Sequence, residues 1–269
     1  MKLSKVEFLE INVNKSDLET IGEDAAALLL TIVMFAEEVN HLRMMLMASI
    51  AGRPENPTLA KVAVSRDHMY IRLLNLKVCE TIFALGGFLE NRRKKRNAEQ
   101  AEQNAFEAAV EKCFEPVEAL RHSKWHKFSK QMRNHLGGHT PPSEVKSWLK
   151  ADLPNADGRM LFHDTMGASS FPTVDDWVFA GFLETHLEAE TRQERVEKYQ
   201  DFLDWLLLDA SSEVIRAAHI LSKGIFVDHL GRDQEATVEY EFPSELVQKS
   251  GEFKLPLLIL APGDARDDD

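Results

Sequence analysis

Apolar residues recur at helical spacing through most of the chain, and strand-like alternation appears only towards its two ends. Residues three and four positions apart share one face of a helix, so this spacing predicts amphipathic helices. The segments predicted to be helical are 16–52, 56–96, 98–136, 143–149, 173–187, 191–206 and 213–229.

Short polar signals mark the ends of these segments. Ser16 followed by Glu19 is typical of a helix start with a reciprocal cap, and Gly231 is placed to end the last helix. Pro116 predicts a kink or a restart within the third segment. Residues 151–173 are rich in Gly, Asp, Pro and Ser and predict a long loop of the functional or mobile kind.

The two ends of the chain have a different period. Residues 1–15 alternate weakly and predict a strand or arm, while 237–242 and 253–260 alternate as strands do. The expected fold is therefore mainly α, a multi-helix bundle with a small C-terminal β appendage. Its parts are an N-terminal arm (1–15), a helical domain (16–232), a β appendage (233–262) and an acidic disordered tail (263–269).

Composition narrows the class of protein. The chain has 269 residues, is 44% apolar and carries a formal charge of −12, which argues against a surface built to coat nucleic acid. Its start has early acids and no apolar core, unlike a signal peptide, and the apolar run 25–36 is too short to span a bilayer. Cys79 and Cys113 lack metal-type spacing and fit buried thiols in a reducing compartment. We therefore expect a cytoplasmic protein without a membrane partner.

One stretch of this acidic chain is positively charged. Between Arg121 and His139 the chain carries cations and interleaved histidines and no acid. Lys124, Lys127 and Lys130 recur at threes and predict an electropositive strip along a helix. The strip is a candidate phosphate-binding surface, together with His135. The alternative is a solvated face whose cations pair with neighbouring acids.

The most specific chemistry lies at the end of this strip. Arg133 and Asn134 precede Gly137-Gly138, and His139 follows at once. A double glycine allows the chain to turn sharply, so the imidazole of His139 is expected to approach the guanidinium of Arg133. A permanent cation beside a group that titrates near neutrality suits phosphate chemistry. The alternative is structural, with Arg133 capping helix carbonyls and His139 bonded to backbone.

A metal site is not predicted from the histidines. The pair His122 and His126 has a suitable spacing, but the cations around it would repel a metal ion. The stretch from Glu38 to His41 resembles half of a di-iron motif, which needs a second copy and further carboxylates. The expectation is no metal and no cofactor.

The motif from Arg133 through Asn134 to His139 resembles that of the HEPN superfamily, whose signature is an Arg, a polar residue and a His after four to six intervening positions. That family consists of α-helical domains that pair as dimers and includes RNA-cleaving toxins and defence proteins. The specific match covers seven residues in a helical context. This chain differs in being longer, strongly acidic and equipped with a β appendage.

The resemblance implies metal-independent RNA cleavage in which the ribose 2′-hydroxyl is the nucleophile. His139 would act as general base or acid, Arg133 would stabilise the charge on the phosphate oxygens, and Asn134 would orient the phosphate or the histidine. It also implies a homodimer with RNA as substrate and a protein partner such as an antitoxin.

Two alternatives come from other functional classes. A non-catalytic homodimeric scaffold would use the first long helix, which carries Met34, Met44, Met45 and Met47, as a partner-binding face, although Met stripes are more often core. A nucleotide or small-molecule binder would use the 151–173 loop as a lid.

Overall fold

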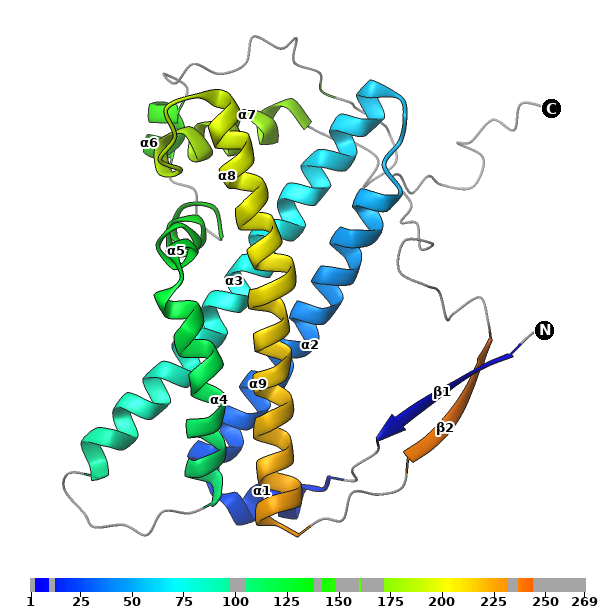
Figure 1. Ribbon diagram of the computed structural model, residues 1–269, viewed down its shortest axis with the longest axis vertical. Coiled ribbons are helices and arrows are strands. Elements are labelled where there is room, and N and C mark those ends of the chain that lie inside the picture. Colours follow the sequence, from blue (N-terminus) through cyan, green and yellow to red (C-terminus); the bar gives the residue numbers. More distant parts are fainter. Residues whose placement is uncertain are drawn as a thin grey trace. The chain divides into compact units, whose positions relative to one another are not determined.

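Helices make up nearly all of the structure, a computed structural model that describes residues 3–9, 13–96, 105–137, 142–148, 160, 172–231 and 237–243 (Figure 1). The mainly α fold with a small β element is confirmed. The helices are α1 (Lys15–Ile21), α2 (Glu23–Ala51), α3 (Pro57–Arg96), α4 (Ala105–His122), α5 (Lys124–Leu136), α6 (Pro142–Trp148), α7 (Pro172–His186), α8 (Arg192–Asp204) and α9 (Ser211–Lys223), with the π-helical segments η1 (Trp205–Ala210) and η2 (Gly224–His229).

The first predicted helix is divided in two. Asn14, not Ser16, caps α1, because its side chain accepts a hydrogen bond from the backbone of Asp17 while the Asp17 carboxylate accepts one from the backbone of Asn14. Gly22 then ends α1 at a φ of 85°, a conformation that favours glycine. Apolar residues keep their helical spacing across this turn. Periodicity alone therefore predicted one helix where the structure has two.

Two other helix boundaries also differ from expectation. Pro116 lies inside α4, so the helix does not restart there, and the predicted third helix breaks at Ser123, where the serine hydroxyl accepts a hydrogen bond from the backbone of Trp125. In contrast, the break expected at 209–212 is absent. Residues 192–229 are helical throughout, and the π-helical turns of η1 and η2 absorb the irregular spacing.

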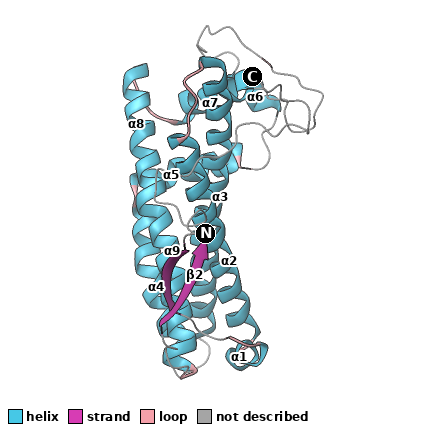
Figure 2. Cartoon of the chain, turned by 90° about the vertical axis from the view of Figure 1, so that its right-hand side faces the viewer, coloured by secondary structure: helices cyan, strands magenta, loops and turns pink. Residues whose placement is uncertain are grey.

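The β element joins the two ends of the chain. β1 (Leu3–Leu9) pairs antiparallel with β2 (Thr237–Pro243), with Val6 opposite Tyr240, and the two strands lie side by side in Figure 2. The N-terminal arm is thus part of the β appendage. Three predicted segments lie outside the described residues. They are the strand at 253–260, the tail, and the 151–173 loop apart from residues 160, 172 and 173.

Packing divides the chain into two compact units. The first comprises residues 1–41, 74–129 and 204–248, and its core includes Val39, Leu74 and Val110. Helices α4 and α9 lie against each other here, and the thiol of Cys113 donates to the carbonyl of Ala217 across their contact. Cys79 and Cys113 are buried free thiols, as predicted, and burial raises the pKa of Cys113 to about 12.

Gly224 is expected to be intolerant of a side chain. A Cβ there would lie 2.5 Å from the Cβ of Ala109, whereas a Cβ at Gly87 in α3 would meet nothing within 4 Å. Gly224→Ala should therefore destabilise the protein by about 1–3 kcal/mol through overpacking. The control Gly87→Ala should stabilise it by about 0.5–1 kcal/mol, because alanine loses less backbone entropy in a helix. Chemical denaturation of both variants measures the difference, and equal stabilities would contradict the close contact.

The second unit comprises residues 42–73, 130–203 and 249–269. Its core contains the fully buried side chains of Leu46, Met132, Phe179 and Phe182. Helices α6 and α7 pack so closely that a Cβ at Gly181 would lie 2.5 Å from the Cβ of Trp148. This close contact holds the buried face of α7 against α6.

Within the described residues, α2 is the one helix long and apolar enough to cross a membrane. Only 33% of its most apolar 18-residue stretch is buried. Core helices of soluble proteins and signal sequences have the same length and composition.

Candidate functional site

Helix α5 presents the predicted basic strip to solvent. Trp125, Phe128, Met132 and Leu136 lie on its buried side, because they recur at intervals of three and four residues. Lys124, Lys127 and Lys130 lie on the exposed side. The ammonium group of Lys124 also lies 4.7 Å from the ring centre of Trp125.

Arg133 and Asn134 lie in the last turn of α5. Arg133 is half-buried and Asn134 is exposed, with an Arg133 nitrogen 3.5 Å from the side-chain oxygen of Asn134. Gly137 follows, and a Cβ there would lie 2.6 Å from the carbonyl oxygen of Arg133. The end of α5 therefore requires glycine for close backbone approach, although Gly137 does not adopt a positive φ.

His139 lies outside the described residues, so its predicted approach to Arg133 stays a prediction. Its position in the sequence nevertheless limits its reach. His139 is three residues beyond Leu136, and three residues span at most about 11 Å. This bound applies to the Cα atoms and follows from the sequence separation alone.

His135 is a polar group beside this motif with partners at both ring nitrogens. Its Nδ1 lies 2.6 Å from a carboxylate oxygen of Glu144 in α6, and its Nε2 lies 2.9 Å from the side-chain oxygen of Gln131. The pair of His135 and Glu144 ties together the two helices that flank His139. Both nitrogens are engaged, so a direct phosphate contact by His135 would require it to release one of these partners.

His186, which the sequence did not single out, completes this cluster. Its ring stacks on His135 with centres 4.7 Å apart and also contacts Phe182 at 4.7 Å. Burial lowers the pKa of His186, the nearby charge of His135 lowers it further, and Glu144 acts in the opposite direction. His186 therefore favours its neutral form in the folded protein.

The lowered pKa of His186 predicts that the folded protein loses stability in mild acid. The pKa of the folded form lies below the ordinary value of 6.5, so the unfolded chain takes up the proton first. Stability conferred by neutral His186 is complete above pH 6.5 and falls as the pH drops through the folded pKa. His186→Phe should flatten the fall in melting temperature between pH 7.5 and 5.5, whereas exposed His229→Phe should not. An unchanged slope in His186→Phe would contradict this assignment.

A second polar cluster lies at the other end of α7. His68 in α3 contacts Asp175 through Nδ1 at 2.7 Å, and Arg72 binds the other oxygen of Asp175 at 3.0 Å. Asp176 lies 3.9 Å from the same His68 nitrogen. The ring of His68 stacks on Phe179 with centres 4.0 Å apart, which fixes its orientation.

Asp67 extends the polar core towards α2. It is 5% exposed in its side chain, accepts a hydrogen bond from the hydroxyl of Ser49, and binds Arg53 at 2.6 Å. Arg66 in turn donates to the Ser49 hydroxyl at 3.0 Å. Ser49 itself is 0% exposed, so this hydrogen-bonded group is part of the interior of the second unit.

One feature of the sequence indicated the buried polar group around Asp67 and Ser49. Asp67 occupies the buried stripe of α3 that continues with Ile71, Leu74 and Val78, where an apolar residue is expected. A charged residue on such a stripe needs a buried partner. Asp175 and Asp176 gave no comparable signal, because acids in or just beyond the first turn of a helix are ordinary.

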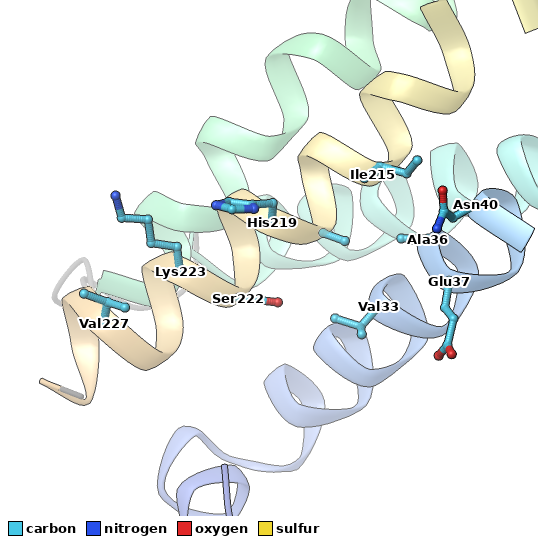
Figure 3. A pocket seen from close by; sticks show the side chains of 10 residues that line it. Val33, Ala36, Glu37, Asn40, Ile215, His219, Ser222, Lys223 and Val227 are labelled. Atoms are coloured by element: carbon cyan, nitrogen blue, oxygen red, sulfur yellow. The ribbon is translucent and has the colours of Figure 1, made fainter. Parts of the chain in front are cut away.

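A groove of about 630 Å³ lies in the first unit between α2 and the helix formed by α9 and η2 (Figure 3). Val33, Ala36 and Ile215 are among its apolar lining residues. Polar side chains also line it, with Glu37 and Asn40 on α2 and His219, Ser222 and Lys223 on α9. Such a groove suits an amphipathic ligand or segment.

Figure 3 places the side chains of His219 and Lys223 on α9 and the carboxylate of Glu37 on α2. None of these residues belongs to the predicted Arg133 motif. Comparison of the chain with protein-family models, with curated protein sequences and with solved structures found no match.

Proposed function

We propose that this protein is a HEPN-like, metal-independent endoribonuclease that uses Arg133, Asn134 and His139. The ribose 2′-hydroxyl attacks the adjacent phosphorus, and the bond to the 5′-oxygen breaks, leaving a 2′,3′-cyclic phosphate and a 5′-hydroxyl. His139 takes the proton from the 2′-hydroxyl or gives one to the leaving oxygen. Arg133 stabilises the charge that collects on the phosphate oxygens, and Asn134 orients the phosphate.

The observation that carries this proposal is the construction of the end of α5. Arg133 and Asn134 lie at a helix end that reaches solvent, and the glycine that follows allows no side chain against the Arg133 carbonyl. In the sequence, His139 follows three residues beyond Leu136. These features place a fixed cation and an amide at one helix end, next to the segment that carries the histidine.

The surroundings of the motif suggest roles for its neighbours. Lys124, Lys127 and Lys130 on the exposed face of α5 would attract the RNA backbone despite the acidic charge of the whole chain. His135, held between Glu144 and Gln131, would position the two flanking helices more readily than it would bind phosphate. We further propose a homodimer in the cytoplasm that is controlled by an antitoxin-like protein partner.

Incubation of the protein with single-stranded RNA in EDTA tests the proposal. Cleavage should proceed, its products should carry 2′,3′-cyclic phosphate ends, and an oligonucleotide of the same sequence with 2′-deoxyribose should remain intact. The deoxy control is decisive because it removes only the nucleophile. Cleavage that requires a divalent ion, or that also cuts the deoxy control, would overturn the proposal.

A non-catalytic homodimeric scaffold is the second candidate, and the surface of α2 favours it. Leu30, Met34, Met44, Met47 and Ile50 are each between 41% and 54% exposed, although Met45 is half-buried. Exposed large apolar side chains of this kind are a feature of helices that bind a partner.

The scaffold candidate predicts a dimer that does not cleave RNA. In sedimentation analysis Met44→Glu combined with Met47→Glu should convert the dimer to monomer, because the charges would have to be buried. Leu208→Glu, which changes a 57% exposed leucine in η1, is the matched control and should remain dimeric. A monomeric wild-type protein would eliminate this candidate.

A further inference from the structure

Three side chains with metal-binding atoms converge in the second unit, apart from the Arg133 motif. His68 comes from α3, Asp175 comes from the first turn of α7, and Asp176 follows it in the same helix. One ligand atom of each lies within 4.8 Å of the other two. We propose that His68, Asp175 and Asp176 form a binding site for a divalent transition-metal ion.

The distances fit a shared ion. A transition metal holds nitrogen and oxygen ligands at about 2.0–2.2 Å, so neighbouring ligand atoms lie roughly 3–4 Å apart. The Nδ1 of His68 is 3.9 Å from Asp176, which is within this range, and 2.7 Å from Asp175, which is the length of their hydrogen bond and would increase when an ion enters. Entry of the ion would replace the hydrogen bond between His68 and Asp175 and release the bridging proton.

The Asp176 carboxylate lacks a partner that would explain its position. It is 33% exposed, makes no hydrogen bond with the described residues, and has only the distant contact with His68. Burial raises its pKa, as does the neighbouring charge of Asp175, while His68 and Lys61 lower it.

Tyr199 provides an independent observation. Its hydroxyl oxygen is fully buried and makes no hydrogen bond. Its ring packs edge-on against Phe179 at 5.6 Å, and Phe179 is the residue that stacks on His68. Burial and the charges of Asp67 and Asp175 raise the pKa of Tyr199, with Arg72 opposing them, so the hydroxyl lies in the field of this cluster. A buried hydroxyl without a partner is costly, and this one belongs to a ring that packs on Phe179, the residue that stacks on His68.

The residues around the three ligands would hold them in place. Arg72 binds the second oxygen of Asp175 at 3.0 Å, which leaves the first oxygen to bind the ion alone. The stacked ring of Phe179 fixes the plane of His68. Outer partners of this kind orient ligands and tune metal affinity.

The ligand types select the class of ion. One imidazole and two carboxylates suit Mn²⁺, Fe²⁺ or Zn²⁺, whereas Mg²⁺ prefers oxygen ligands and retains its water. The site also goes beyond the proposed ribonuclease function. Asp175 and His186, beside the Arg133 motif, are eleven positions apart on α7, a separation of about 16 Å along the helix.

Metal titration of the full chain, stripped with EDTA and dialysed, tests the site. Mn²⁺ binding is followed by electron paramagnetic resonance, which detects the free ion, and Zn²⁺ binding by calorimetry. The wild type should bind one equivalent of either ion, and excess Mg²⁺ should compete poorly. Asp176→Asn and His68→Gln should each weaken binding at least about 10-fold. Exposed Asp209→Asn in η1 removes the same charge elsewhere and should bind as the wild type does.

The outcomes separate this site from the proposed function. Absence of binding by the wild type, or equal affinity in wild type and Asp176→Asn, would overturn the proposal. Asp176 is only half-buried, so its variant keeps the test valid if His68→Gln does not fold. Cleavage of RNA in EDTA is expected to be unaffected by Asp176→Asn, so failure of the metal site and failure of the ribonuclease proposal are independent results.

Discussion

Replacement of Arg133 or His139 by alanine is expected to lower the rate of RNA cleavage in EDTA by at least about 100-fold. Loss of a preorganised charge donor at a developing oxyanion costs about 10²–10³ in rate, and loss of a general acid or base costs about 10²–10⁴. Arg133 is half-buried at the surface of α5, so its truncation should not unfold the helix. The rate is measured with a labelled RNA under single-turnover conditions.

Matched variants distinguish catalysis from loss of charge. Arg216→Ala removes an exposed arginine from α9, and His229→Ala removes an exposed histidine from η2, so both should cleave at the wild-type rate. Arg133→Lys should show an intermediate rate, because lysine keeps the charge but not the planar pair of donors. Wild-type activity in both Arg133→Ala and His139→Ala would remove the assignment of the motif.

Gly137→Ala offers a geometric check on the same motif. The added Cβ would lie 2.6 Å from the carbonyl oxygen of Arg133, so the last turn of α5 must shift. A shift of that size at a catalytic cation reduces the rate steeply, because reacting groups tolerate little displacement. A rate equal to that of wild type would show that the end of α5 is not part of the catalytic geometry.

Helices were predictable from the sequence because their signal is local. The spacing of Val62, Ile71, Leu74 and Val78 in α3, and the Asn56 side chain that accepts backbone hydrogen bonds at its start, fix that helix within a few residues. Boundaries failed where apolar spacing persists through a break, as at Gly22, or where a π-helical turn shifts the spacing without a break, as at η1. The pairing of β1 with β2 joins segments too distant for any local pattern to reveal.

The candidate site was only partly predictable for the same reason. The exposed lysines of α5 and its buried side follow from periodicity within one helix. The contacts of His135 with Glu144 and His186 depend on how α5, α6 and α7 pack. The cluster of His68 and Asp175 joins residues 107 positions apart, so no local pattern indicated it.

Asp67→Ala is expected to produce the largest loss of stability, about 2–4 kcal/mol. Asp67 accepts hydrogen bonds from Ser49 and Arg53, and bonds to a charged group contribute about 1.5–3 kcal/mol. Breaking a buried ion pair costs about 3–5 kcal/mol when the remaining charge stays buried. Arg53 is 44% exposed, so it can recover water and reduce that cost, whereas Ser49 is fully buried and loses its acceptor.

Denaturation with urea at pH 7 measures this loss, and the set of variants identifies its cause. Asp67→Asn should cost less than Asp67→Ala, because the amide oxygen still accepts a hydrogen bond from Ser49. The loss of stability in Arg53→Ala should be smaller than that in Asp67→Asn, because the Ser49 hydroxyl and Arg66 remain near Asp67. Asp209→Ala removes an exposed carboxylate and should lie within about 0.5 kcal/mol of wild type. Equal stability of Asp67→Ala and Asp209→Ala would mean that the polar core around Ser49 does not stabilise the second unit.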